Sequence, residues 1–433
     1  MFTLLALVSS SAFAATPVYD DCPQEAEVEA LVAEHMAEAV DLYRIVRLDT
    51  DAFEEAMASG EGALLPAIDE SGGFTEVELN VSEYDLQETV GSVAGKGDDD
   101  VEMEDNYTAP YILGCDALDT SCGVVTFFSA DGGDDDLFEG MVSGGGEGSL
   151  YFESVNTLLS NATGTSLDDL EAVAPGCGVV YNGLHHVELE REDDMPEEDH
   201  DHGEAEEDED EDAFIRADVN IILDADQKYY AAGKSSVWSR QRAMFYTVQT
   251  SYALLEPLLG SNFSLMLHLE SQETWTSGGP TTTDGWQLKN DLNNSSYHMI
   301  NHPSKNEVSF FYYGVDVSGG LAGVAGGVCG LSGYDTTWGS NQSNQNNHAW
   351  AQQVKDVDGG FAFHSLKGRI GVMAHEIGHM FGGTHSDGNA NDTRTNGVFT
   401  AKGHSVMSSP AVTETWFSDD NADNVYQCLD RVF

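Results

Sequence analysis

The sequence predicts an α/β protein with a β-rich upstream half, followed by a mixed twisted sheet with long helices. Three observations support this. Residues from about 40 to 190 alternate short apolar runs with clusters of Gly and Asp, which is typical of strands joined by turns. An acidic run from Arg191 to Asp212 then interrupts the chain, with fifteen Asp or Glu among twenty-two residues. Downstream, apolar strands alternate with segments of helical periodicity, the pattern of a sheet with helices packed on it.

The segment boundaries follow from these changes in composition. Residues 1–15 contain an apolar run that ends in Ala12-Phe13-Ala14, which predicts a secretory signal peptide, although no Lys or Arg precedes the run. A buried helix is the alternative for this segment. A block of like charges repels itself and stays extended, so residues 191–213 are predicted to be an acidic disordered linker. This leaves an upstream domain over 16–190 and a downstream domain over 214–433.

The charge of the chain limits its partners. The 433 residues include 41% hydrophobic residues, enough for two cores, yet the formal net charge is -59. Only 17 Lys and Arg face 76 Asp and Glu, which excludes nucleic acid as a partner. The excess of acidic over basic residues indicates adaptation to a salty medium, and specific cation binding is the alternative. No stretch has the roughly 18 apolar residues of a membrane span. We therefore expect a secreted monomer.

The downstream half shows its elements in order. Apolar runs predict three strands, and apolar residues at helical intervals predict a long and a short helix. The predicted strands are Ala217–Asp226, Phe263–Ser271 and Val308–Asp316, and the predicted helices are Trp238–Leu259 and Asp284–Leu292. The glycine-rich run Ser318–Gly330 predicts an edge strand, with which an extended substrate backbone could pair.

Six cysteines agree with an oxidising compartment, in which disulfides persist, and no C-x-x-C motif is present. Cys115 and Cys122 are close enough in sequence to close a small loop. Cys329 and Cys428 have the spacing of a long-range link across one domain. Cys22 and Cys177 either pair or stay free.

The segment Gly371–His385 reads GVMAHEIGHMFGGTH and carries the chemistry of the chain. We expect a helix over Leu366–Met380 with Ser365 as its N-cap. Four apolar residues at helical spacing would face the sheet along one stripe. They are Ile370, Ala374, Ile377 and Phe381.

Three histidines in this segment predict a zinc site. His375 and His379 are four residues apart, so they project from one face of the helix and can share an ion. His385 can reach the same ion only if the chain turns back after the helix. Gly382 and Gly383 provide this turn, because a residue without Cβ can adopt a positive φ. Three protein ligands and an open fourth position are typical of catalytic zinc.

Glu376 follows the first of these histidines and is the candidate general base. It would take a proton from zinc-activated water and deliver it to a leaving amine, which predicts peptide hydrolysis. Two alternatives stay open. One is a secreted acidic metal-binding protein with structural zinc or collected calcium, which would not require Glu376. The other is a metal-dependent hydrolase that acts on other bonds.

The motif H-E-x-x-H-x-x-G-x-x-H resembles the signature of the metzincin zinc proteases, and Met407 in GHSVMSSP stands where the metzincin Met-turn is expected. Within the clan, residues from Phe214 onward look most like the reprolysin (adamalysin, ADAM-type) branch. The segments VNIILDAD, LMLHLESQETWTSGG, GGLAGVAGGVCG and FSDDNADNVYQCL follow that branch in order. The resemblance implies a zinc metalloendopeptidase with a C-terminal helix, a Cys329–Cys428 disulfide and structural calcium.

The chain departs from the reprolysin pattern at two positions. Ser386 stands between the third ligand and Asp387, and Ser405 occupies a position that is usually Cys. The extra disulfides of that branch near the site are therefore absent from this sequence, which leaves the shape of the S1′ loop open.

The upstream half more weakly resembles reprolysin propeptides, through RIVRLDTDAFEEAM, FEGMVSGGGEGSLYFESV and HHVELER. Such propeptides often keep the enzyme latent through a free cysteine on the zinc. The resemblance therefore implies a zymogen inhibited by its own propeptide and processed between Asp194 and Arg216. Cys177 in APGCGVV is the candidate switch, Cys122 in TSCGVV is a second one, and a disulfide from Cys177 to Cys22 is the alternative.

Overall fold

The structure is a computed structural model, and it describes the greater part of both halves of the chain. The described residues are 15–35, 42–59, 62–68, 73–83, 92–96, 111–115, 122–128, 137–143, 149–163, 165, 167–170, 173–181, 215–233, 237–253, 263–293, 307–318, 322–329, 347–352, 366–385, 392–395, 400–403, 405–408 and 416–433. Residues 1–14 and the acidic run, for which a signal peptide and a linker are predicted, lie outside these ranges.

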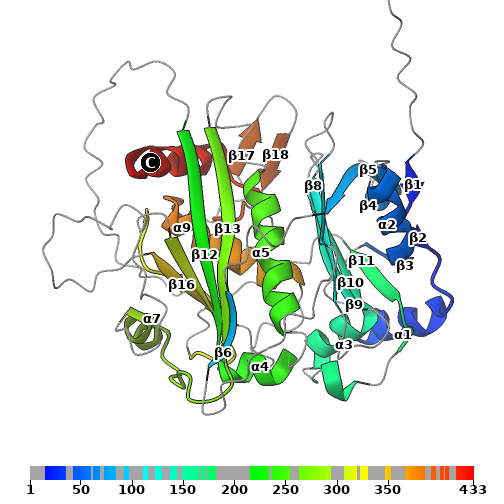
Figure 1. The fold of residues 1–433 in the computed structure, drawn as a ribbon, viewed down its shortest axis with the longest axis horizontal. Coiled ribbons are helices and arrows are strands. Elements are labelled where there is room, and N and C mark those ends of the chain that lie inside the picture. Colours follow the sequence, from blue (N-terminus) through cyan, green and yellow to red (C-terminus); the bar gives the residue numbers. More distant parts are fainter. Residues whose placement is uncertain are drawn as a thin grey trace, which may run out of the picture.

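The upstream half is dominated by a ten-stranded sheet, which confirms the prediction that it is β-rich (Figure 1). The strand order is β1-β4-β5-β7-β8-β9-β10-β11-β3-β2, and all neighbours are antiparallel except β1 and β4. The strands are β1 (Thr16–Pro17), β2 (Tyr19–Asp20), β3 (Tyr43–Leu48), β4 (Gly62–Ile68), β5 (Phe74–Glu83), β7 (Tyr111–Cys115), β8 (Cys122–Phe128), β9 (Leu137–Ser143), β10 (Leu150–Ser154) and β11 (Cys177–Tyr181). The helices are α1 (Glu25–His35), α2 (Thr50–Ser59) and α3 (Val155–Thr163), with a short 3₁₀ turn, η2 (Leu167–Asp169).

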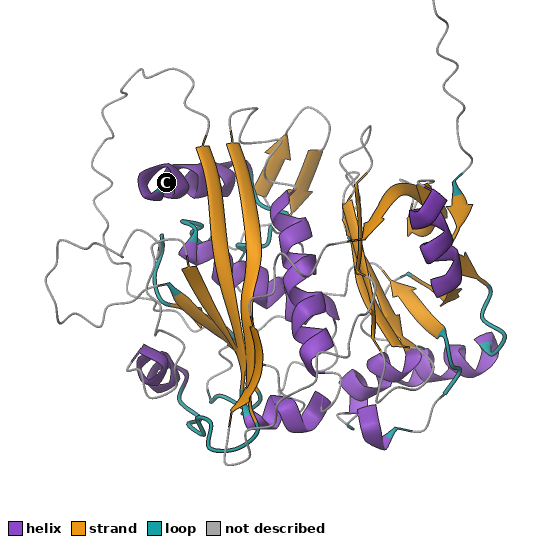
Figure 2. Cartoon of the chain, in the orientation of Figure 1, coloured by secondary structure: helices purple, strands orange, loops and turns teal. Residues whose placement is uncertain are grey.

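The downstream half is built on a six-stranded mixed sheet with helices, as predicted (Figure 2). The order is β15-β16-β14-β12-β13-β6, and only β15 runs antiparallel to its neighbour. Its own strands are β12 (Ile215–Ala225), β13 (Phe263–Trp275), β14 (Glu307–Tyr313), β15 (Gly323–Ala325) and β16 (His348–Gln352), with a separate hairpin of β17 (Asp392–Thr395) and β18 (Thr400–Gly403). The helices are α4 (Gln227–Gly233), α5 (Val237–Ala253), α7 (Gly285–Asn293), α9 (Leu366–Met380) and α10 (Asp419–Val432).

One strand of the downstream sheet comes from the upstream half of the chain. β6 (Ser92–Lys96) pairs in parallel with the end of β13, in a register that runs from Ser92 opposite Ser271 to Lys96 opposite Trp275. In Figure 1 this blue strand lies beside the green strands β12 and β13. The sequence pattern did not predict this crossover, because strands pair through their backbones, and the sequence of a strand does not indicate which other strand it pairs with.

The hydrophobic core is continuous between the two halves. Buried upstream residues such as Val124 and Met141 belong to the same cluster as Leu267 of β13 and Ile370 of α9. Helix α5 lies between the two sheets in Figure 1, and it packs against β8 and β9 on one side and β13 and α9 on the other.

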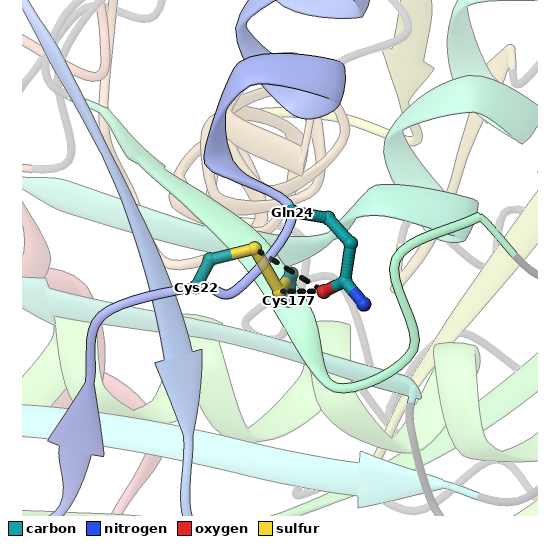
Figure 3. The surroundings of a disulfide bond; sticks show 3 residues. All are labelled: Cys22, Gln24 and Cys177. Carbon is teal, nitrogen blue, oxygen red and sulfur yellow. Dashed lines mark hydrogen bonds between the residues drawn. A yellow bond between two sulfur atoms is a disulfide. The ribbon is translucent and has the colours of Figure 1, made fainter.

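The described disulfides confirm one predicted link and correct another prediction. Cys329 is bonded to Cys428, with an S–S distance of 2.00 Å. Cys177 is bonded to Cys22, so it has no free thiol, and the prediction that it acts as a cysteine switch is wrong in this state of the protein (Figure 3). Cys177 opens the buried strand β11 and faces the chain just before α1, where the amide oxygen of Gln24 lies 3.6 Å from its sulfur (Figure 3).

The remaining two cysteines are described only in their backbone. Strand pairing sets Cys115 of β7 opposite Cys122 of β8. Their side chains lie outside the described part of the structure, so a bond between them stays a prediction. No described helix is long and apolar enough to cross a membrane.

Candidate metal centre

Helix α9 carries the predicted site and spans Leu366–Met380, as the periodicity predicted. Every residue of the helix is buried, including the apolar stripe that begins at Ile370. The predicted N-cap Ser365 lies outside the described residues. The backbone N–H of Leu366, the first residue of the helix, donates to the Glu153 carboxylate at 2.8 Å, and this carboxylate comes from β10 of the upstream sheet. A carboxylate at a helix N-terminus satisfies an orphan donor and complements the helix dipole.

Helix α9 ends at Met380, just before Gly382 and Gly383, which were predicted to turn the chain. Gly382 has a φ of +104°, and its N–H donates to the carbonyl of His379 at 2.9 Å. The N–H of Gly383 donates to the carbonyl of Gly378 at 2.8 Å. A Cβ on Gly382 would lie 2.7 Å from both the Asn424 carbonyl oxygen and the Cβ of Cys428, which belong to α10. Backbone conformation and packing therefore both require glycine at this position.

The turn brings the three predicted ligands together. The Nε2 atoms of His375, His379 and His385 lie 3.1 Å from one another in all three pairs. Such a triangle has a circumradius of about 1.8 Å, so one ion can lie about 2.0–2.1 Å from each nitrogen, as zinc requires. The residues therefore fit a zinc ion. Among the side chains that the structure describes, this is the one group of three or more His, Cys, Asp or Glu ligands close enough to share a metal, and the predicted calcium stays a prediction.

Backbone carbonyls orient two of the imidazoles. Nδ1 of His375 lies 2.7 Å from the carbonyl oxygen of Val406, and Nδ1 of His379 lies 2.8 Å from that of Gly383. Since a carbonyl can only accept, each Nδ1 carries the proton and each Nε2 presents its lone pair to the centre. Burial lowers the pKa of His375 to about 3 and that of His379 well below its usual value, and the neighbouring imidazoles add to both shifts. Both ligands are thus neutral at physiological pH, the form that binds a metal.

Met407 lies beneath this helix, where the Met-turn was expected. It is fully buried, and its neighbour Val406 supplies the carbonyl that orients His375. A Cβ on Gly378 would lie 2.5 Å from the sulfur of Met407, and one on Gly383 would lie 3.1 Å from its methyl carbon. The two glycines therefore let the thioether approach the backbone of the ligand-bearing segment, a contact that suits a flexible side chain.

Glu376 points toward the edge strand of the downstream sheet. Burial raises the pKa of its carboxyl to about 8, and a hydrogen bond from the Ala325 backbone and the charge of Lys289 partly offset this shift. A Cβ on Gly323 would lie 2.7 Å from Oε1 of Glu376, so glycine gives the carboxylate its room. Both backbone contacts come from β15.

Strand β15 confirms the predicted glycine-rich edge. It pairs with β16 through Gly323, Val324 and Ala325, and it is the terminal strand of the six-stranded sheet. The chain then continues to Cys329, whose N–H donates to the carbonyl of His379 at 2.8 Å. The edge strand is thus fixed to the end of the ligand helix, beside Glu376.

Comparisons with known proteins give one match to a family model. Residues 216–421 match the family model of metallo-peptidase family M12, and this range includes Glu376, all three histidines and Met407. A search of curated proteins finds no match. Among solved structures, metalloproteinase-II from Bacteroides fragilis is similar, with a TM-score of 0.44 and 14% sequence identity over 92% of this chain and 94% of that chain.

Proposed function

We propose that this protein is a secreted zinc-dependent endopeptidase. The observation that carries the proposal is the set of three Nε2 atoms, each 3.1 Å from the other two, with the carbonyl-bound Nδ1 of His375 and His379 fixing their lone pairs. The match of residues 216–421 to the M12 metallopeptidase model supports the same class. The reprolysin-type branch, which the sequence resembles, is part of this proposal.

His375, His379 and His385 would hold the zinc ion, which when bound polarises a substrate carbonyl and makes water more acidic. Glu376 receives the proton of the attacking water on its carboxylate and passes it to the nitrogen of the departing amine. Its burial suits this task, because a carboxyl whose pKa is raised toward 8 holds and releases a proton near neutral pH. A nearby cation would lower this pKa and favour the basic form.

The substrate backbone would bind along β15, beside Glu376. This strand is the end of the sheet order, so an extended peptide can add itself as a further strand through main-chain hydrogen bonds. Pairing of this kind does not read side chains, so it suits protein substrates of varied sequence. The disulfides Cys22–Cys177 and Cys329–Cys428 agree with the secretion that we propose. Inhibition by the upstream half stays a prediction, and it cannot depend on the thiol of Cys177.

The test is Glu376→Gln, with the exposed Glu54→Gln of α2 as the matched control. We expect Glu376→Gln to keep one zinc per chain and to lose about 10²–10⁴-fold of the casein-hydrolysis rate, the usual contribution of general-base catalysis. The control should hydrolyse casein as the unaltered protein does, and a zinc chelator should stop both. Full activity of Glu376→Gln would refute the mechanism. Zinc binding without hydrolysis in any variant would favour the alternative, a metal-binding protein.

A further inference from the structure

Three buried charged side chains link the upstream sheet to the helix that carries the metal ligands. Arg369 of α9 donates from Nη2 to Oε1 of Glu139 on β9 at 2.8 Å, and the same nitrogen lies 3.9 Å from Oε2 of Glu153 on β10. Arg369 is 4% exposed, and the two glutamates are at most 1% exposed. The buried guanidinium of Arg369 is thus paired with carboxylates of the upstream sheet.

Glu153 is fixed within the upstream half and in turn holds the first turn of α9. Its carboxylate accepts hydrogen bonds from the Tyr181 hydroxyl and, at 2.7 Å, from the side-chain amide of Asn161. It also accepts the N–H of Leu366, the first residue of α9, at 2.8 Å. The Glu153 carboxylate is therefore held by donors of the upstream half and by the backbone of the downstream half.

Two further features join the halves away from this cluster. β6 pairs with residues Ser271–Trp275 of β13 and covers that edge of the downstream sheet. The hydrophobic core runs without interruption from β8 and β9 through α5 to α9. A continuous apolar core is typical of permanent interfaces rather than of releasable ones.

Separation of the halves would be costly at each contact. Arg369 would lose the carboxylates that compensate its burial, and an unpaired buried charge is strongly destabilising. The first turn of α9 would lose its cap. The edge of β13 would expose unpaired backbone groups, which promote aggregation.

We propose that the upstream half stays bound to the downstream half after the acidic segment between them is cut, and that Glu139 and Glu153 act as positioning residues for the first turn of α9. Arg369 with Glu139 and Glu153, which we call the clamp, lies at the N-terminal end of this helix, and the metal centre lies toward its other end. His375 is nine residues beyond Leu366, which is about 14 Å along the axis at 1.5 Å per residue. The clamp can therefore hold the helix without occupying the centre.

The experiment uses the full chain with a recognition sequence for a site-specific protease placed within residues 191–213, in the Glu376→Ala background. After complete cleavage, size-exclusion chromatography with light scattering should show one species with the summed mass of both fragments, at low and at high salt. Two separated folded fragments would overturn the proposal. The readout is mass, so the test does not depend on peptidase activity. A folded downstream fragment freed of the upstream half would refute this inference alone, and failure of the proposed function would leave it standing.

The contribution of the clamp is measured with Glu139→Gln and Glu153→Gln, each compared with Glu78→Gln, an exposed carboxylate on the same sheet. Either clamp variant should raise the dissociation constant of the cleaved fragments at least about 100-fold, since breaking a buried ion pair leaves a buried charge behind. Amide hydrogen exchange in the first turn of α9 should accelerate in Glu153→Gln and stay unchanged in Glu78→Gln. Equal affinities in all three variants would remove the positioning role. If a clamp variant fails to fold, the cleavage experiment on the otherwise unaltered sequence still decides retention.

Discussion

Replacement of Gly382 by alanine tests the turn that brings His385 to the metal centre. Two costs can be worked out from the structure. A φ of +104° is unfavourable for a residue with a Cβ, at about 1–2 kcal/mol. The added Cβ would also lie 2.7 Å from the Asn424 carbonyl oxygen and 2.7 Å from the Cβ of Cys428. Helix α10 cannot easily retreat, because Cys428 is bonded to Cys329.

The overlap with α10 adds about 1–3 kcal/mol, the usual cost of inserting an extra carbon into a packed site. We therefore expect Gly382→Ala to lower the free energy of unfolding by about 2–5 kcal/mol. Its zinc affinity should fall at least about 10-fold, because a displaced turn moves His385 away from the other two ligands.

The matched control is Gly278→Ala, which separates the two costs. Gly278 also has a positive φ, +73°, but a Cβ there would meet nothing within 4 Å. It should lose only about 1–2 kcal/mol of stability and keep its zinc affinity. The measurements are urea unfolding of the metal-free proteins and zinc titration against a competing chelator. Equal losses of stability in the two variants, with zinc affinity intact in both, would refute this account of the turn.

Two more predictions concern the pH dependence of stability and the Cys329–Cys428 disulfide. The metal-free protein should lose stability as the pH falls from 6.5 toward 3, because the unfolded chain binds a proton at His375 that the folded chain, with a pKa of about 3, does not. The carboxyl of Glu376, whose pKa is raised to about 8, has the opposite effect on the free energy of unfolding between pH 4.5 and 8. Urea unfolding is therefore compared with that of His375→Asn, whose loss of stability with falling pH should be shallower by up to about 1.4 kcal/mol per pH unit. Parallel losses in the two proteins would contradict the burial of this imidazole. Cys428→Ser should lower the free energy of unfolding by about 2–5 kcal/mol, because the bond to Cys329 closes a loop with a sequence separation of 99. Differential scanning calorimetry of Cys428→Ser and Cys329→Ser should show the same loss, and a thermal transition like that of the unaltered protein would show that packing alone holds α10.

The local pattern of the sequence was enough to predict the centre of the candidate site. His375 and His379 share a helix face because four residues make about one turn, and this holds wherever the helix packs. Gly382 is required by a positive φ, which few other residues adopt. The strands β12, β13 and β14 were likewise visible as apolar runs. These features depend on residues close together in the chain.

The tertiary structure alone decided the features that join distant segments. Glu153 caps a helix more than two hundred residues away, β6 crosses into the downstream sheet, and Cys177 is bonded to Cys22 rather than free. A buried glutamate, a short apolar strand and a cysteine look the same in a sequence whichever partner they meet. The sequence by itself therefore determined which residues can bind a metal and turn a chain, because spacing and backbone preference are local properties. Which carboxylate holds the first turn of α9, and which strand covers the edge of β13, was decided only when folding brought the two halves together.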